Sequence, residues 1–236
     1  MSQALKTKVF ADGADLQSIL ALAADPQIAG FTTNPTLMKK AGITDYEAFA
    51  KEVLEQVTEH PISFEVFADD EAEILRQARI IKTWGENVYV KIPVTTTKGE
   101  SLENVVRELS NDGVKVNVTA LFTLDQVRTI TDAVKDGAPS NISVFAGRIA
   151  DAGVDPVPLM AESVQIAAAA PAAEIIWASP REVLNLVQAQ QTGCHIITMT
   201  HDLIAKIPSL GKDLDQFSLE TVQMFRNDAV SAGFSL

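Results

Sequence analysis

The feature that most constrains this chain is a regular alternation of short apolar runs with longer amphipathic segments. Most of the runs are nearly continuous in apolar residues, which is typical of parallel strands covered on both faces. The intervening segments are long enough for the crossover helices that parallel strands need. The eight expected strands begin near Val9, Ile28, Ile62, Val88, Lys115, Asn141, Glu174 and His195.

Helical periodicity is clear in several of the intervening segments. In Asp45–Thr58, apolar residues recur at the spacing of one helix face. Asp69 and Asp70 precede another such segment, and acidic residues favour a helix N-terminus. The sequence also predicts helices over Leu124–Val134 and Arg181–Gln190.

Eight such units in 236 residues, with no break in composition, predict a single (β/α)8 TIM barrel. The alternative is an open doubly wound sheet, but no G-x-G-x-x-G motif follows the first run. We expect residues 1–236 to form one barrel domain, with 209–236 as a linker and a helix outside the barrel pattern. The linker would be Ser209–Asp215, and the helix, Phe217–Val230, would be a lid or an arm onto a neighbouring subunit.

Charge and composition exclude several classes of protein. The chain carries 19 basic and 31 acidic residues, a net charge of −12, and this acidity argues against nucleic acid and anionic membranes as partners. No run reaches the ~18 apolar residues of a membrane span, and no export signal is evident, so we expect a cytoplasmic protein. The single cysteine, Cys194, excludes an intramolecular disulfide, and three scattered histidines predict no metal site.

Catalytic residues of a barrel lie at the carboxyl ends of its strands. Lys91 is notable there because three apolar or aromatic residues flank it on each side. Apolar surroundings disfavour a charged amine, and a neutral amine attacks carbonyls to form Schiff bases. The alternative is a lysine that keeps its charge in water beyond an apolar stem.

Other polar residues fall at the same ends of neighbouring strands. Asp12 and Glu65 could be acid/base groups around Lys91, or only its ion-pair partners. Arg148 and Arg181, with the hydroxyls of Ser143 and Ser179, could hold a phosphate, although surface ion pairs are the commoner fate of a single arginine. His201 lies at the same end, without an evident nucleophile beside it.

Five segments in order closely resemble the transaldolase family of Schiff-base aldolases, over about Val9–Pro208. The chain is similar in length to members of the short subfamily, which also contains fructose 6-phosphate aldolases. The matching segments are GFTTNPT (Gly30–Thr36), VYVKIPVT (Val88–Thr95), VNVTALF (Val116–Phe122), ISVFAGRI (Ile142–Ile149) and Ala178-Ser179.

This resemblance implies a barrel without metal or organic cofactor, with Lys91 as the Schiff-base lysine and Asp12 as the acid/base group of carbon–carbon cleavage. Glu65 and Thr119 match the pair that holds the catalytic water. Residues implied for the three-carbon dihydroxyacetone piece are Asn34, Ser143, Thr33 and Asn117. Residues implied for the phosphate are Arg148, Ser179 and Arg181.

Two positions bear on the activity within that family. Aldolase-type members are expected to carry Gln at Glu65 and Tyr at Phe145, so the present residues are similar to transaldolases. Two departures stand beside this resemblance. Gly13 follows Asp12 where Thr or Ser is usual, and Pro180 stands where an aromatic residue is usual, which puts the direction of Arg181 in question.

We therefore predict a transaldolase of the pentose phosphate pathway that moves a dihydroxyacetone unit from fructose 6-phosphate or sedoheptulose 7-phosphate to an aldose phosphate. The alternatives are a fructose 6-phosphate aldolase that releases dihydroxyacetone, a lysine anchor for pyridoxal phosphate, and a non-catalytic barrel that binds sugar phosphates. The resemblance also implies a homo-oligomer, either a decamer of two pentamers, a pentamer or a dimer.

Overall fold

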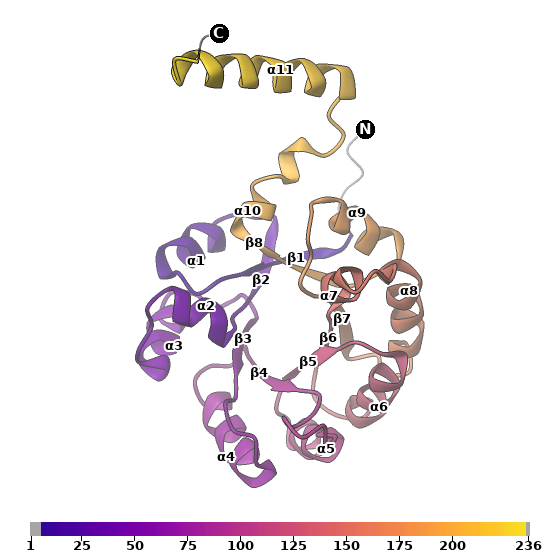
Figure 1. Ribbon diagram of the computed structural model, residues 1–236. Coiled ribbons are helices and arrows are strands. Elements are labelled where there is room, and N and C mark those ends of the chain that lie inside the picture. The colour runs from indigo at the N-terminus through magenta and orange to yellow at the C-terminus, as the bar shows by residue number, and fades with distance from the viewer. Residues whose placement is uncertain (1–5, 235–236) are drawn as a thin grey trace.

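The computed structural model describes residues 6–234 as a closed barrel of eight parallel strands, each hydrogen-bonded to the next, with β8 returning to β1 (Figure 1). This closure confirms the (β/α)8 prediction over the open sheet. Each strand begins within one residue of its predicted start. The strands are β1 (Lys8–Asp12), β2 (Ile28–Thr32), β3 (Ile62–Glu65), β4 (Val88–Pro93), β5 (Val116–Leu121), β6 (Ser140–Val144), β7 (Ala173–Trp177) and β8 (Ile196–Thr200).

Helices surround the barrel, and a further helix, α11, stands apart from it (Figure 1). The helices are α1 (Leu16–Ala23), α2 (Pro35–Lys40), α3 (Tyr46–Leu54), α4 (Glu71–Lys82), α5 (Glu103–Asn111), α6 (Leu124–Val134), α7 (Ala146–Asp151), α8 (Pro156–Ala167), α9 (Leu184–Gln191), α10 (His201–Ile204) and α11 (Leu214–Ser231). A short 3-10 helix, Ile207–Ser209, precedes α11.

Local capping explains where the helices start. The predicted bounds of α6 are correct, because Thr123 and Gln126 form a capping box at its N-terminus. Asp70 caps α4 by accepting a hydrogen bond from the Glu73 amide. The predicted helix from Arg181 starts three residues later, since the Arg181 amide is hydrogen-bonded to the Asn185 side chain instead.

The barrel interior is apolar toward the amino ends of the strands and polar toward their carboxyl ends. Phe10 and Ile196 belong to a small buried cluster that is separate from the main core between strands and helices. They lie two residues before Asp12 and Thr198, and side chains two apart on a strand share a face. Both Asp12 and Thr198 line a cavity, so this cluster forms the floor beneath it.

The helix expected over 217–230 is confirmed as α11, but it is longer at both ends. Asp213 caps it, which shortens the expected linker. No residue of α11 is buried, and several large apolar side chains are exposed along it: Leu214, Phe217, Leu219, Val222, Met224, Phe225 and Val230. Among the described residues, no helix is both long and apolar enough to cross a membrane.

Candidate functional site

A cavity of about 620 Å³ opens at the carboxyl ends of the strands. Four cationic and two anionic side chains line it, so it is locally basic in an acidic protein. A site of this kind suits a small phosphorylated substrate. The charged lining residues are Lys40, Lys91, Arg148, Arg181, Asp12 and Glu65.

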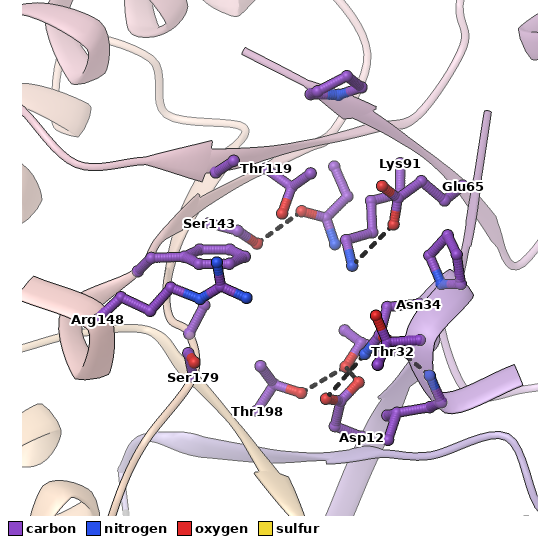
Figure 2. Close-up of a pocket in the computed structure, with 18 of the residues that line it drawn as sticks. Asp12, Thr32, Asn34, Glu65, Lys91, Thr119, Ser143, Arg148, Ser179 and Thr198 are labelled. Carbon is purple, nitrogen blue, oxygen red and sulfur yellow. Dashed lines mark hydrogen bonds and ion pairs between the residues drawn. The ribbon is translucent and has the colours of Figure 1, made fainter. Parts of the chain in front are cut away.

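Lys91 lies deep in this cavity, and only 8% of its surface is exposed. The strand register places it level with Glu65 on β3 and Asn117 on β5. Its Nζ donates to the Thr33 carbonyl at 3.0 Å. The same Nζ lies 3.2 Å from Glu65 Oε2 (Figure 2). Lys91 is therefore a buried amine beside a carboxylate, not a lysine that extends into solvent.

Asp12 faces the same cavity from β1 and is held by two neighbours, one on β2 and one at the N-cap of α2. Thr32 donates to its Oδ1 at 2.8 Å, and the Asn34 amide group donates to its Oδ2 at 3.4 Å (Figure 2). Burial raises the pKa of Asp12, although Lys91 and these two hydrogen bonds act in the opposite direction. A carboxyl group with a raised pKa is suited to both taking and returning a proton.

Both polar atoms of the Asn34 side chain are hydrogen-bonded. Asn34 is the N-cap of α2, where its Oδ1 accepts from the Leu37 amide at 3.0 Å. Pro35 follows at the first helical position, where its missing N–H costs nothing. The cap leaves the Asn34 amide nitrogen directed at Asp12.

A second polar network joins β3, β5 and β6 and is centred on Asn117, which is level with Lys91. Asn117 donates to Ser63 at 2.9 Å. It accepts from Ser143 at 2.7 Å (Figure 2). Within residues 6–234, the buried hydroxyl of Thr119 has no hydrogen-bond partner, so it is free to bind a water or a substrate oxygen. Ala120 beside it has a φ of 63°, a strained value of the kind found at functional sites.

Arg148 lies on the opposite side of the cavity from Lys91 (Figure 2). Its guanidinium stacks 5.3 Å from the centre of the Phe145 ring. Phe145 in turn contacts Phe122, with ring centres 5.8 Å apart. The stack places a cation beside an aromatic ring in the lining of the cavity.

Arg181 also lines the cavity, so Pro180 does not turn it away. Its guanidinium is bidentate to Asp151, with bonds of 2.9 and 2.5 Å, and its Nη1 donates to Ser179 Oγ at 3.1 Å. The hydrogen bonds from Arg181 lower the pKa of Asp151. Asp151 thus anchors Arg181 beside Ser179.

The backbone at Ser179 depends on a close approach by Gly147. Ser179 has a φ of 59°, and a Cβ built on Gly147 would lie 1.6 Å from its carbonyl oxygen. Only glycine fits there. The start of α7 therefore packs directly on the turn that carries Ser179 and Arg181.

Eleven of the twelve predicted site residues line this one cavity: Asp12, Asn34, Glu65, Lys91, Asn117, Thr119, Ser143, Phe145, Arg148, Ser179 and Arg181. The exception is Thr33, whose hydroxyl donates to the Ser63 carbonyl, so the side chain that faces the cavity is that of Thr32. Strand alternation predicts this choice once Asp12 is known to pair with Thr32. Thr33 contributes its carbonyl to Lys91.

Sequence reasoning missed several residues at or behind the site. Lys40 is one helical turn after Thr36, and both line the cavity. Thr198 lies two residues before Thr200 on β8, a spacing that indicates a shared face. Tyr46 begins α3, and its hydroxyl accepts from the Glu65 amide at 2.6 Å and donates to the Glu65 carbonyl at 3.1 Å.

Gly13, the unusual neighbour of Asp12, has a packing explanation. A Cβ at this position would lie 2.9 Å from Nε2 of His201. His201 therefore occupies the space that a side chain after Asp12 would take. Cys194 and His195, just before β8, are packing residues, since Cys194 is buried and the His195 ring accepts from the Ile175 amide.

In chemical terms, the cavity combines a buried amine, two carboxylates and a pair of arginines. An amine in this setting can attack a carbonyl, and the carboxylates can move protons at either side of it. The arginines and Ser179 can hold a phosphate group. In the described part of the chain, no group of three or more His, Cys, Asp or Glu side chains is close enough to hold a metal ion.

Comparisons with known proteins agree with this arrangement. A family model described as Transaldolase/Fructose-6-phosphate aldolase matches residues 9–236. Proteins named probable transaldolase are 36% identical in Dehalococcoides mccartyi and 39% in Streptococcus equi subsp. zooepidemicus. Each of these alignments covers 85% of this chain and 89% of the relative.

Solved structures of low identity share the fold. A dihydrodipicolinate synthase from Rhodopseudomonas palustris has a TM-score of 0.57 at 18% identity, over 82% of this chain and 69% of that one. A putative phosphonomutase from Burkholderia cenocepacia also has a TM-score of 0.57, at 14% identity over 94% of each chain. At these identities, the similarity supports the barrel architecture and no activity.

Proposed function

This chain belongs to the transaldolase/fructose-6-phosphate aldolase family, and on that premise we propose that it is a transaldolase. It would move a dihydroxyacetone unit from fructose 6-phosphate or sedoheptulose 7-phosphate to an aldose phosphate, as a cytoplasmic enzyme of the pentose phosphate pathway. The observation that carries the proposal is the position of Lys91, which is buried in the cavity with its Nζ 3.2 Å from Glu65.

In the proposed first step, neutral Lys91 attacks the C2 carbonyl of the ketose phosphate. The carbinolamine that forms loses water to give a Schiff base. Glu65 is close enough to exchange a proton with the amine. The Thr119 hydroxyl, which bonds to none of the described residues, can hold the water that leaves. Acid/base assistance of this kind contributes typically ~10²–10⁴-fold.

In the second step, Asp12 takes the proton of the C4 hydroxyl. The C3–C4 bond breaks, its electrons move into the iminium group, and an aldose phosphate leaves. The enamine of dihydroxyacetone stays on Lys91 and attacks the carbonyl carbon of a second aldose phosphate, whose oxygen recovers the proton from Asp12. Hydrolysis of the new Schiff base then frees the product.

The remaining lining residues fit the two ends of such a substrate. Asn34, Asn117 and Ser143 surround Lys91 with amide and hydroxyl groups that suit the hydroxyls of the three-carbon unit. Arg148, Ser179 and Arg181 lie across the cavity, where a terminal phosphate would reach. The carbon chain of the sugar would extend from the residues around Lys91 to those that hold the phosphate.

Transfer is favoured over release of dihydroxyacetone by the residue at position 145. A hydroxyl beside the enamine would help water to protonate it and release the three-carbon unit. Phe145 lines the cavity and has no proton to give. The enamine is therefore expected to persist until an aldehyde acceptor arrives.

The test is an exchange assay with fructose 6-phosphate and erythrose 4-phosphate. A transaldolase forms glyceraldehyde 3-phosphate and sedoheptulose 7-phosphate, and releases little dihydroxyacetone when the acceptor is omitted. Rapid release without acceptor would assign the aldolase activity instead. Sugar-phosphate binding without either reaction would indicate a non-catalytic barrel, and a yellow protein would indicate pyridoxal phosphate on Lys91.

We also propose that residues 1–236 form one barrel domain whose C-terminal arm, α11, packs against another copy in a homo-oligomer, either a decamer, a pentamer or a dimer. The exposed apolar side chains of α11 support this, since water disfavours such a surface. Truncation after Asp213 should lower the mass measured by light scattering. An unchanged mass would contradict a role of α11 in assembly.

A further inference from the structure

Asp12 lies at the end of a chain of hydroxyl groups that crosses three strands. Thr198 on β8 and Thr32 on β2 have their Oγ1 atoms 2.5 Å apart, and Thr32 Oγ1 lies 2.8 Å from Asp12 Oδ1 (Figure 2). Only 8% of Thr198 and 3% of Thr32 are exposed. Neither threonine is among the residues that the sequence analysis assigned to the site.

The proton count of this chain has one solution when Asp12 is ionised. A carboxylate only accepts hydrogen bonds, so Thr32 must use its single proton on Asp12. Thr32 can then only accept from Thr198, which is therefore the donor. The direction of the chain runs from Thr198 through Thr32 to Asp12.

We propose that Thr198 is a positioning residue for the reaction: it fixes the Thr32 hydroxyl as a donor to Asp12 Oδ1 and so reserves Oδ2 as the oxygen that exchanges protons with substrate. This proposal rests on the proposed function, in which Asp12 is the acid/base group. Thr198 acts through Thr32 and holds the orientation of the carboxylate.

The contacts of the other carboxylate oxygen agree with this division. Oδ2 has the Asn34 amide nitrogen at 3.4 Å, which is a long hydrogen bond. Asn34 is also restrained from approaching further, because its Oδ1 caps α2. Oδ1 is thus the tightly held oxygen and Oδ2 the one available to a substrate hydroxyl.

The wider surroundings of Asp12 set the direction of the pH effect. Lys91 on β4 and His201 on α10 are the charged or titratable groups that favour its ionised form, and Thr32 and Asn34 add hydrogen bonds. Loss of the Thr198 donor weakens the Thr32 bond to the carboxylate. The carboxylate is then less stabilised, so the pKa of Asp12 rises and the acidic limb of the rate profile moves to higher pH.

The experiment compares Thr198→Val, Thr198→Ser and Thr131→Val in the full chain. Valine keeps the shape of threonine without the hydroxyl, and serine restores the hydroxyl. Thr131→Val is the matched control, because Thr131 is also buried, on α6, and its hydroxyl has no hydrogen-bond partner among the described residues. Its removal should leave the exchange activity unchanged.

For Thr198→Val we expect kcat to fall about tenfold, as for the loss of one buried hydrogen bond, with KM within about twofold of the parent chain. The acidic limb should shift to higher pH. Thr198→Ser should restore most of the kcat and most of the original position of the acidic limb. A folded Thr198→Val with an unchanged kcat and acidic limb would overturn the proposal.

A second readout separates this proposal from the proposed function. The Asp12 carboxyl carbon, followed by isotope-labelled NMR without substrate, should titrate at higher pH in Thr198→Val than in the parent chain. An unchanged titration overturns the positioning role even where the exchange assay finds another activity. If Thr198→Val fails to fold, Thr198→Ala and Thr198→Ser give the same comparison with and without the hydroxyl.

Discussion

The two sides of the cavity are built differently, although both are polar. On the lysine side, Lys91 and Thr32 are at least nine-tenths buried, and the lysine has a carboxylate neighbour that is largely enclosed. On the arginine side, 44% of the Arg181 side chain and 53% of its partner Asp151 are exposed. One side is removed from water, and the other remains in contact with it.

This difference matches two tasks in the proposed reaction. Proton transfer and Schiff-base chemistry gain from low-dielectric surroundings, where positioned charges act more strongly. Phosphate groups must enter and leave in every cycle, which an exposed pair of arginines permits. The lysine side should therefore control kcat, and the arginine side should control KM.

The largest predicted effect lies on the lysine side. Asp12→Asn removes the proposed base of carbon–carbon cleavage, so kcat for exchange should fall by about 10²–10⁴-fold with a smaller change in KM. Steady-state kinetics measures both values. A kcat within a few-fold of the parent chain would assign the proton transfer to another group.

The same variant carries a stability prediction with a defined sign. Because burial raises the pKa of Asp12 in the folded state, ionising it costs stability as pH rises above its unfolded value of about 3.9. Asp12→Asn should therefore have a higher free energy of unfolding than the parent chain at neutral pH, and the gap should narrow in acid. Urea unfolding at neutral and at acidic pH measures this difference in free energy of unfolding. A difference of the opposite sign would show that Lys91 and the hydrogen bonds stabilise the carboxylate more than burial destabilises it.

The next largest effect should fall on the arginine side and on KM. Arg148→Gln removes a charge that would contact the substrate phosphate, so KM for fructose 6-phosphate should rise by about 10–100-fold, as expected for hydrogen bonds to a charged group, and kcat should change little. Arg128→Gln is the control, since Arg128 pairs with Asp125 and Glu162 on the outer helices. Equal effects of the two variants would argue against a phosphate contact at Arg148.

A smaller effect should follow from removing a hydrogen bond that holds the Glu65 backbone on the lysine side. Tyr46→Phe leaves the Glu65 amide without its 2.6 Å acceptor, which should lower the free energy of unfolding by about 1–3 kcal/mol and kcat by a few-fold as Glu65 shifts. Tyr89→Phe is the matched control, because Tyr89 lies on β4 beside a cavity at the other end of the barrel. Denaturant unfolding and steady-state kinetics measure both effects. If the two variants do not differ, Tyr46 does not hold Glu65 in position.

The same two sides show what could be predicted from sequence. Lys91, Asp12 and Glu65 stand at strand ends, and strand ends of a barrel converge, so local pattern is enough to bring them together. Thr198 and Tyr46 could not be assigned, because their roles depend on hydrogen bonds to other elements, at Thr32 and the Glu65 backbone. The choice of Thr32 over Thr33 depended on strand alternation, which a short TTNP motif leaves ambiguous.

On the arginine side, the predictions from sequence were less complete in geometry. The motif predicted Ser179 and Arg181 at the site, and both line the cavity. The late start of α9, the left-handed backbone at Ser179 and the anchoring of Arg181 by Asp151 come from contacts between loops. Such contacts have no periodicity for a sequence to reveal.

The most direct test of the central claim is borohydride trapping with fructose 6-phosphate, followed by peptide mass spectrometry, with Lys91→Ala as the control. The account predicts a reduced three-carbon adduct on Lys91 in the parent chain, and neither an adduct nor exchange activity in the folded variant. An adduct on another lysine, or exchange activity near that of the parent chain in Lys91→Ala, would contradict Schiff-base catalysis by Lys91.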